Sequence, residues 1–138
     1  MSKVTVTGGS IEEIARKVVT EVPRQMASRA YRASNELRNS ALDILRGQRS
    51  GRMYGSHQAS APGEPPANWT GLFRLSWQAR TYTSGTTFKS SIETGVPYAE
   101  FLEDGTPGGQ MAPRPHHERI QDHALPEIMR IYDEPYDI

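Results

Sequence analysis

Histidine is the first residue type to consider for chemistry, because imidazole is a common metal ligand and titrates near neutral pH. The four histidines are His57, His116, His117 and His123. Two ligands on one helical face need a spacing of three or four residues. His116 and His123 are seven residues apart, close to two turns, with Glu118 and Asp122 nearby. Clustered polar groups are often merely structural or solvated, so the sequence predicts no metal site and no cofactor.

Carboxylates are the second group that could do chemistry. Glu100, Glu103 and Asp104 lie within five residues, but acid–base catalysis needs one of them buried with a shifted pKa. A short helix followed by Gly-Thr-Pro is expected to expose them. The sequence contains no glycine-rich phosphate loop, no G-x-S-x-G motif and no cysteine. We therefore expect a protein that is not an enzyme.

Arginine points to a third kind of chemistry, the binding of phosphates. Residues 1–60 hold 10 Lys+Arg and 5 Asp+Glu, whereas residues 61–138 hold 6 and 11, so the halves carry +5 and -5. An Arg-rich helix over 24–52 predicts either a DNA-binding surface or a face toward another subunit. Its residues are Arg24, Arg29, Arg32, Arg38 and Arg46, followed by Arg49 and Arg52, with Tyr31 and Tyr54 interleaved. Glu36 and Asp43 dilute the charge.

A short strand and a long helix are expected to open the chain. Lys3–Thr7 alternates and is β-branched, and Ser10 with Glu13 forms the capping-box pattern. Apolar residues then recur every three or four positions, which predicts one apolar helical face. They are Ile11, Ile14, Ala15, Val18, Val22, Met26, Ala30, Ala33, Leu37, Ala41, Ile44 and Leu45.

Pro23 interrupts this pattern, so the helix is expected to be kinked or to be two helices, about 11–22 and 24–46. Gly47 is a natural stop. The second part of the stripe is largely alanine, whose small side chain lets another backbone come close. We expect that face to lie against a sheet or a neighbouring helix.

A long Gly-, Ser- and Pro-rich segment, residues 47–69, predicts no regular structure. It is either an arm that orders against a partner or a surface loop. A helical turn then begins near Thr70. Residues 77–83 and 86–94 alternate around Ser84-Gly85, which predicts a β-hairpin.

Two more helices are expected after the hairpin. The first covers 97–103 and ends at Gly105, and a loop over 106–115 follows. The second covers 116–132, where Pro126 should bend or split it. The whole chain, 1–138, is then a single α+β domain: a long N-terminal helix packed on a small, mainly antiparallel sheet, with short helices after it. No segment has the roughly 18 apolar residues of a membrane helix, so we expect a soluble protein without membrane contact.

Three segments, taken in order, resemble one protein family. Thr70-Gly71-Leu72 and its flanks are similar to a "TG-L-R-S" turn. Residues 98–106 are similar to a "YA-x-F-x-E-x-GT" segment, and residues 111–115 to an "M-A/P-x-R-P" segment. The family is the neck and tail-completion proteins of long-tailed phages, also called minor tail or head–tail joining proteins. The order of the expected elements agrees with it. The family usually has an aromatic residue after Arg-Pro, where this chain has His116-His117.

The resemblance implies a ring, hexameric or dodecameric, between the head connector and the tail, with genomic DNA passing through its lumen. The partners are then other copies of the chain and the neighbouring head-connector and tail proteins. The protein would be in the virion, and in the host cytoplasm during assembly. A DNA-binding accessory protein acting through the Arg-rich helix is the alternative.

The resemblance also singles out residues for structural or subunit contacts. They are Thr70, Gly71, Leu72, Tyr98, Ala99, Glu103, Gly105, Thr106, Pro113, Arg114 and Pro115. Among them, Thr70 should cap a helix, Gly71 should allow close approach, and Leu72 with Leu75 should anchor the turn. Gly105 suits a positive φ. Glu103 and Arg114 are candidates for an ion pair across the 106–115 loop.

Overall fold

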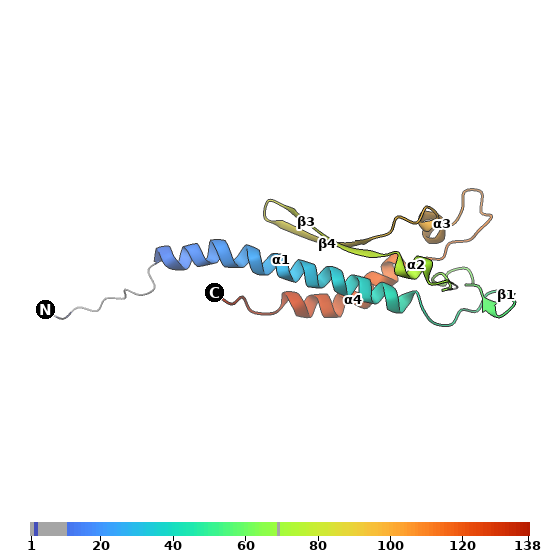
Figure 1. The fold of residues 1–138 in the computed structure, drawn as a ribbon, viewed down its shortest axis with the longest axis horizontal. Coiled ribbons are helices and arrows are strands. Elements are labelled where there is room, and N and C mark those ends of the chain that lie inside the picture. Colours follow the sequence, from blue (N-terminus) through green and yellow to red (C-terminus); the bar gives the residue numbers. More distant parts are fainter. Residues whose placement is uncertain (1, 3–10, 69) are drawn as a thin grey trace.

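One long helix organises the α+β fold that the sequence predicts (Figure 1). The structure, a computed structural model, describes residues 2, 11–68 and 70–138. The strand predicted at 3–7 and the cap predicted at Ser10 lie outside these residues. The elements in order are α1 (Ile11–Ile44), β1 (Met53–Tyr54), β2 (His57–Gln58), α2 (Leu72–Leu75), β3 (Gln78–Ser84), β4 (Thr87–Glu93), α3 (Ala99–Asp104) and α4 (His117–Tyr132).

Neither proline inside a predicted helix ends it. Helix α1 runs for 34 residues with Pro23 inside, so the two-helix alternative is wrong. Helix α4 runs for 16 residues with Pro126 inside, and it is not split. A proline in a helix interior costs about 3 kcal/mol. The two helices lie against each other in antiparallel directions, and this packing favours the helical conformation over the length of each.

The sequence predicted that the alanine stripe of α1 lies against a sheet or a helix, and it lies against both. Ala30, Ala33 and Ala41 are almost fully buried. In Figure 1 the β3–β4 hairpin lies on one side of α1 and α4 on the other. The contact is close enough for Ser90 Oγ to donate a hydrogen bond of 2.6 Å to the carbonyl of Ala30.

The predicted hairpin is confirmed. Strands β3 and β4 pair antiparallel from Gln78↔Glu93 to Ser84↔Thr87, around a two-residue turn whose Gly85 has a φ of 60°. One face of the hairpin carries the pairs Ala79↔Ile92, Thr81↔Ser90 and Thr83↔Phe88. In the described part of the chain this sheet has only two strands.

The hydrophobic core is small and lies toward the C-terminal end of α1. Ala41, Leu45, Trp77 and Ile120 form it, and Ile44, Phe73 and Ile92 pack around it. Helices α1, α2 and α4 and strand β4 therefore meet at this core, together with Leu45 directly after α1 and Trp77 directly before β3. Among the described helices, none is long and apolar enough to cross a membrane.

The 47–69 segment is more regular than predicted, because it contains the short β1–β2 pair. Two of its charged side chains hold the segment together, and one of them also joins it to the end of α1. Arg49 donates to the carbonyls of Pro65 (2.7 Å) and Ile44 (2.9 Å). Glu64 Oε1 accepts the backbone N–H groups of Ser50 (3.0 Å) and Ala61 (2.6 Å), and these bonds hold the pKa of Glu64 below its usual value. The segment is a folded loop in the described structure.

Enlarging a buried alanine tests the close approach of α1 to its neighbours. Ala33→Leu should destabilise the protein by about 1–3 kcal/mol, because the added methyl groups have no room between backbones. Ala27→Leu is the matched control, since Ala27 is exposed on the same helix and should change stability little. Urea unfolding followed by circular dichroism measures both, and equal stability of the two variants would contradict this packing.

Candidate functional site

The candidate site forms where the end of α3 meets the start of α4. Gly105 ends α3 with a φ of 82°, as predicted. A side chain there would also clash, because a Cβ would lie 2.8 Å from the carbonyl oxygen of Met111. The chain then returns over 106–115, and the N–H of Arg114 donates to the carbonyl of Leu102 at 2.7 Å. This return places Glu103 beside the first residues of α4.

Glu103 binds the backbone at the start of α4. Its Oε2 accepts the N–H groups of His116 (2.8 Å) and His117 (3.2 Å). A carboxylate at this end of a helix satisfies unpaired donors and opposes the positive end of the helix dipole. The Glu103 side chain is only 17% exposed, so the expectation that it is exposed is wrong for this residue. Glu100 and Asp104 are exposed as expected.

Glu103 and Arg114, predicted as an ion pair either within a subunit or between neighbours, do not form one within the described chain. The Arg114 side chain instead donates to Ser60 Oγ (2.8 Å) and to the carbonyl of Ala112 (2.6 Å). Arg114 therefore ties the 106–115 loop to the 47–69 loop. Sequence spacing could not show this, because Ser60 is brought there by the tertiary fold.

His116 is fully buried and packs as an aromatic ring. It contacts the rings of Phe73 (centroids 5.4 Å apart) and Trp77 (5.9 Å) edge to face. Its Nδ1 lies 2.9 Å from the carbonyl of Arg114 and 2.9 Å from Glu103 Oε2. Both neighbours are acceptors, so Nδ1 carries the proton. Burial lowers the pKa of His116, which favours the neutral ring.

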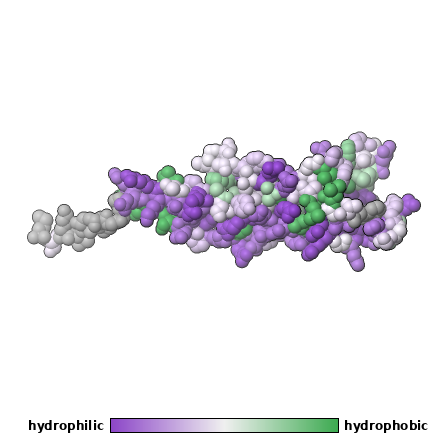
Figure 2. All heavy atoms as spheres, viewed as in Figure 1, coloured by the Kyte–Doolittle hydropathy of each residue, from purple (hydrophilic) through white to green (hydrophobic). Residues whose placement is uncertain are grey.

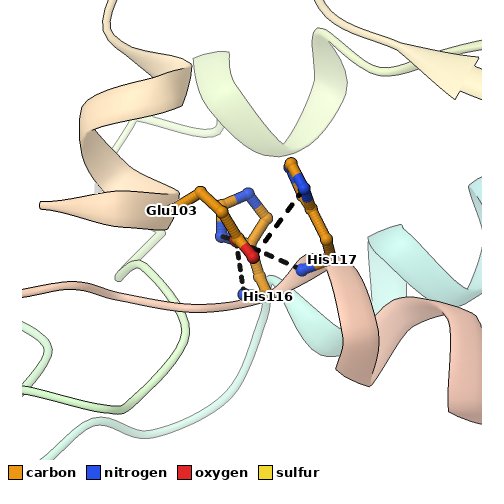
Figure 3. Close-up of side chains that lie close together, drawn as sticks. All are labelled: Glu103, His116 and His117. Carbon is orange, nitrogen blue, oxygen red and sulfur yellow. Dashed lines mark hydrogen bonds and ion pairs between the residues drawn. The ribbon is translucent and has the colours of Figure 1, made fainter.

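His117 completes a cluster of three side chains, shown in Figure 3. Its Nδ1 lies 3.7 Å from Glu103 Oε1, and its ring is 4.8 Å from that of His116. One donor atom from each of the three residues lies within 4.8 Å of the others. The spacing from His116 to His123 did not reveal this group, because its third member, Glu103, comes from another helix. His123 instead bonds Ser40 Oγ on α1 at 2.8 Å.

The Thr-Gly turn is built differently from the prediction. Gly71, with a φ of 78°, holds the N-cap position of α2, and Thr70 lies one residue earlier. The Thr70 hydroxyl still accepts the N–H of Leu72 at 3.2 Å. Gly71 is needed for its positive φ and not for close approach, because a Cβ there would meet only ordinary contacts.

Phe73 anchors this turn in place of the predicted pair. Leu72 and Leu75 are exposed, so their predicted anchoring role is wrong. Phe73 packs against Trp77, Tyr98 and His116.

The three motif segments come together in space. Phe73 of the first contacts Tyr98 of the second, with ring centroids 6.1 Å apart. Thr106, which closes the second, accepts the N–H of Met111 in the third at 2.8 Å through its hydroxyl. Ala99 and Pro115 are half-buried beside them, and the carbonyl of Pro113 accepts the N–H of Gly63 at 3.0 Å. The motifs thus form one mutually supporting unit.

The five helix arginines predicted to face DNA or another subunit each have a partner within the chain. Arg29 is 3% exposed and donates to the carbonyls of Tyr132 (2.9 Å) and Pro135 (3.0 Å). Arg32 forms two bonds to Glu134, at 2.9 and 2.7 Å. The other partners are Glu21 for Arg24, the carbonyl of Trp77 for Arg38, and Asp43 for Arg46.

The arrangement suits structural fixation and cation binding. One Glu103 oxygen accepts two backbone N–H groups, and one possible ligand atom from each of Glu103, His116 and His117 lies within 4.8 Å of the others. No family model, curated protein or solved structure matches this chain.

Removing the Glu103 carboxylate tests its role at the start of α4. Glu103→Ala should destabilise the protein by about 0.5–2 kcal/mol, the range for a lost helix cap. Amide exchange at His116 and His117 should become faster. Asp104→Ala is the control on the same helix, because Asp104 is exposed. Urea unfolding and exchange measured by NMR give the result, and identical behaviour of the two variants would disprove the capping role.

Proposed function

We propose that this chain is a structural subunit of the neck or head-proximal tail end of a long-tailed phage. Copies of it form a ring of six or twelve between the head connector and the tail, and DNA passes through the lumen. The resemblance of three ordered segments supports this, and so does their packing as one unit around Phe73. The protein then acts in the virion, with head-connector and tail proteins as further partners.

The observation that carries the proposal is an uncovered apolar stripe on the first half of α1. Ile11 is 86% exposed, Ile14 52% and Val18 40%. Their spacing of three and four residues puts them on one helical face. Hairpin β3–β4 and α4 cover the later part of α1 and leave this part uncovered, as the apolar atoms at this end of the helix show (Figure 2).

A second apolar patch lies at the opposite end of the molecule. Leu72 and Leu75 on α2 and Tyr98 and Phe101 at α3 are all more than 40% exposed. Figure 1 places α2 and α3 far from the start of α1. Two unlike patches at opposite ends suit head-to-tail contacts, in which one patch of each copy meets the other patch of the next copy. Repeated around an axis, such contacts close a ring.

Contiguous exposed apolar surface on a soluble protein marks an interaction site. Covering it removes apolar area from water, which stabilises association by roughly 25 cal/mol per Å² before the entropic cost of binding. This gives the exposed motif residues Leu72 and Tyr98 a role: contact with a neighbour.

Charge contributes less to the proposed assembly than the sequence suggests. One ion pair, Arg32–Glu134, joins the basic half to the acidic half within the chain. Arg29 and Arg38 are taken up by backbone carbonyls, which leaves fewer helix arginines for direct DNA binding. The apolar patches therefore support assembly over the DNA-binding alternative.

Val18→Asp should shift the ring toward monomers, because a charge placed in the stripe cannot be buried against a neighbour without a large penalty. Thr20→Asp is the control: it adds the same charge at an exposed site about 200° around the same helix. Native mass spectrometry and light scattering measure the assembly state. The ring should persist at high salt, since apolar burial is not screened.

A wild-type chain that stays monomeric at high concentration and high salt would contradict the proposal. Equal assembly of the Val18→Asp and Thr20→Asp variants would show that the apolar stripe does not form the contact between copies. Circular dichroism should show the same helix content in both, because neither side chain is buried in the subunit.

A further inference from the structure

We propose that Glu103, His116 and His117 bind a divalent transition-metal ion, for which Zn²⁺ is the best fit. The three residues offer one carboxylate oxygen and two imidazole nitrogens, the donor types that Zn²⁺ prefers after thiolate. Their donor atoms already lie within 4.8 Å of one another. The site is independent of the proposed ring.

Glu103 and His117 have the separation of two ligands that share an ion. Glu103 Oε1 and His117 Nδ1 are 3.7 Å apart, which is too long for a hydrogen bond. Two donors that each lie about 2.0–2.1 Å from one zinc ion are at most about 4.2 Å apart. Glu103 Oε2 is held by two backbone N–H groups, so the carboxylate is fixed with Oε1 available.

His116 has the tautomer of a metal-binding histidine. Its Nδ1–H donates to the carbonyl of Arg114 at 2.9 Å, and metal-binding histidines donate their second ring N–H to such a group. The proton on Nδ1 leaves Nε2 as a lone pair. Nε2 is buried and has no hydrogen-bond partner in the described structure. Its lone pair is therefore available to coordinate an ion.

Binding of an ion requires a modest movement of the three ligand side chains. A separation of 4.8 Å exceeds by about 1.4 Å the roughly 3.4 Å between two ligands of a tetrahedral zinc site. His117 can supply this movement, because its side chain is 57% exposed. It also lines an open pocket together with Trp77, Glu100 and Gln121. A fourth position on the ion would open toward this pocket, where water can complete the coordination.

The consequence of binding is a cross-link between α3 and α4. Zn²⁺ would join Glu103 at the end of α3 to two residues at the start of α4, on the same junction that the Glu103 hydrogen bonds already hold. Metal that binds only the folded state raises the free energy of unfolding with the logarithm of its concentration once that concentration exceeds the dissociation constant.

Zinc titration of the tag-free full-length chain tests the site after treatment with EDTA. We expect one Zn²⁺ per chain by calorimetry, and a melting temperature that rises with added zinc and falls back with EDTA. Co²⁺ should give the visible spectrum of a tetrahedral site. His117→Ala and His116→Phe should each weaken binding at least tenfold. Phenylalanine keeps the aromatic packing with Phe73 and Trp77, so loss of binding in that variant is not loss of the fold.

His57→Gln is the control, because it removes an imidazole outside the cluster and should bind zinc like the wild type. Absence of zinc binding by the wild type at micromolar concentrations would overturn the proposal. Unchanged binding by both His116→Phe and His117→Ala would overturn it as well, since the ion would then be held elsewhere.

Discussion

The close packing of α1 against two partners at once is the constraint on which the rest of the structure depends. A stripe of alanine lets the hairpin come so close to the helix that the Ser90 hydroxyl donates a hydrogen bond to the backbone carbonyl of Ala30. Small side chains also bury little area each. The core is therefore confined to Ala41, Leu45, Trp77 and Ile120. The ends of the molecule keep their apolar side chains exposed, and this leads directly to assembly as the proposed function.

Arginine hydrogen bonds hold together segments that a larger hydrophobic core would otherwise join. Arg29, Arg38, Arg49 and Arg74 all donate to backbone carbonyls of distant segments. A guanidinium group has five donors in a planar fork, so it can satisfy carbonyls that no helix or sheet pairs. These bonds join α1 to the C-terminal segment, to Trp77 directly before β3 and to α2, and Arg49 joins the 47–69 loop to α1 through the carbonyl of Ile44. A high arginine content in a helix is therefore poor evidence for a nucleic-acid surface unless the partners of each side chain are known.

Local pattern predicted the elements well, and tertiary contact decided the rest. The periodicity of three and four residues identified α1 and α4, and Ser84-Gly85 identified the hairpin. The alternative in which Pro23 divides α1 into two helices was wrong. The local sequence does not show how packing along a 34-residue helix compares with one lost hydrogen bond. The partner of Glu103 was also missed. It depends on the return of the 106–115 loop, which a backbone bond from Arg114 to Leu102 fixes. His116 and His117, next to Arg-Pro at a helix start, were the clue in the sequence.

The motif residues separate into two groups by the direction they face, and the separation links fold to proposed function. Glu103, Gly105 and Arg114 face inward and lock the loops to the start of α4. Leu72 and Tyr98 are exposed on the same unit. A surface that must fit a neighbour has to be rigid, because ordering it on binding would oppose association. The inward group supplies that rigidity through hydrogen bonds, so loss of an inward residue should weaken assembly without touching the contact surface.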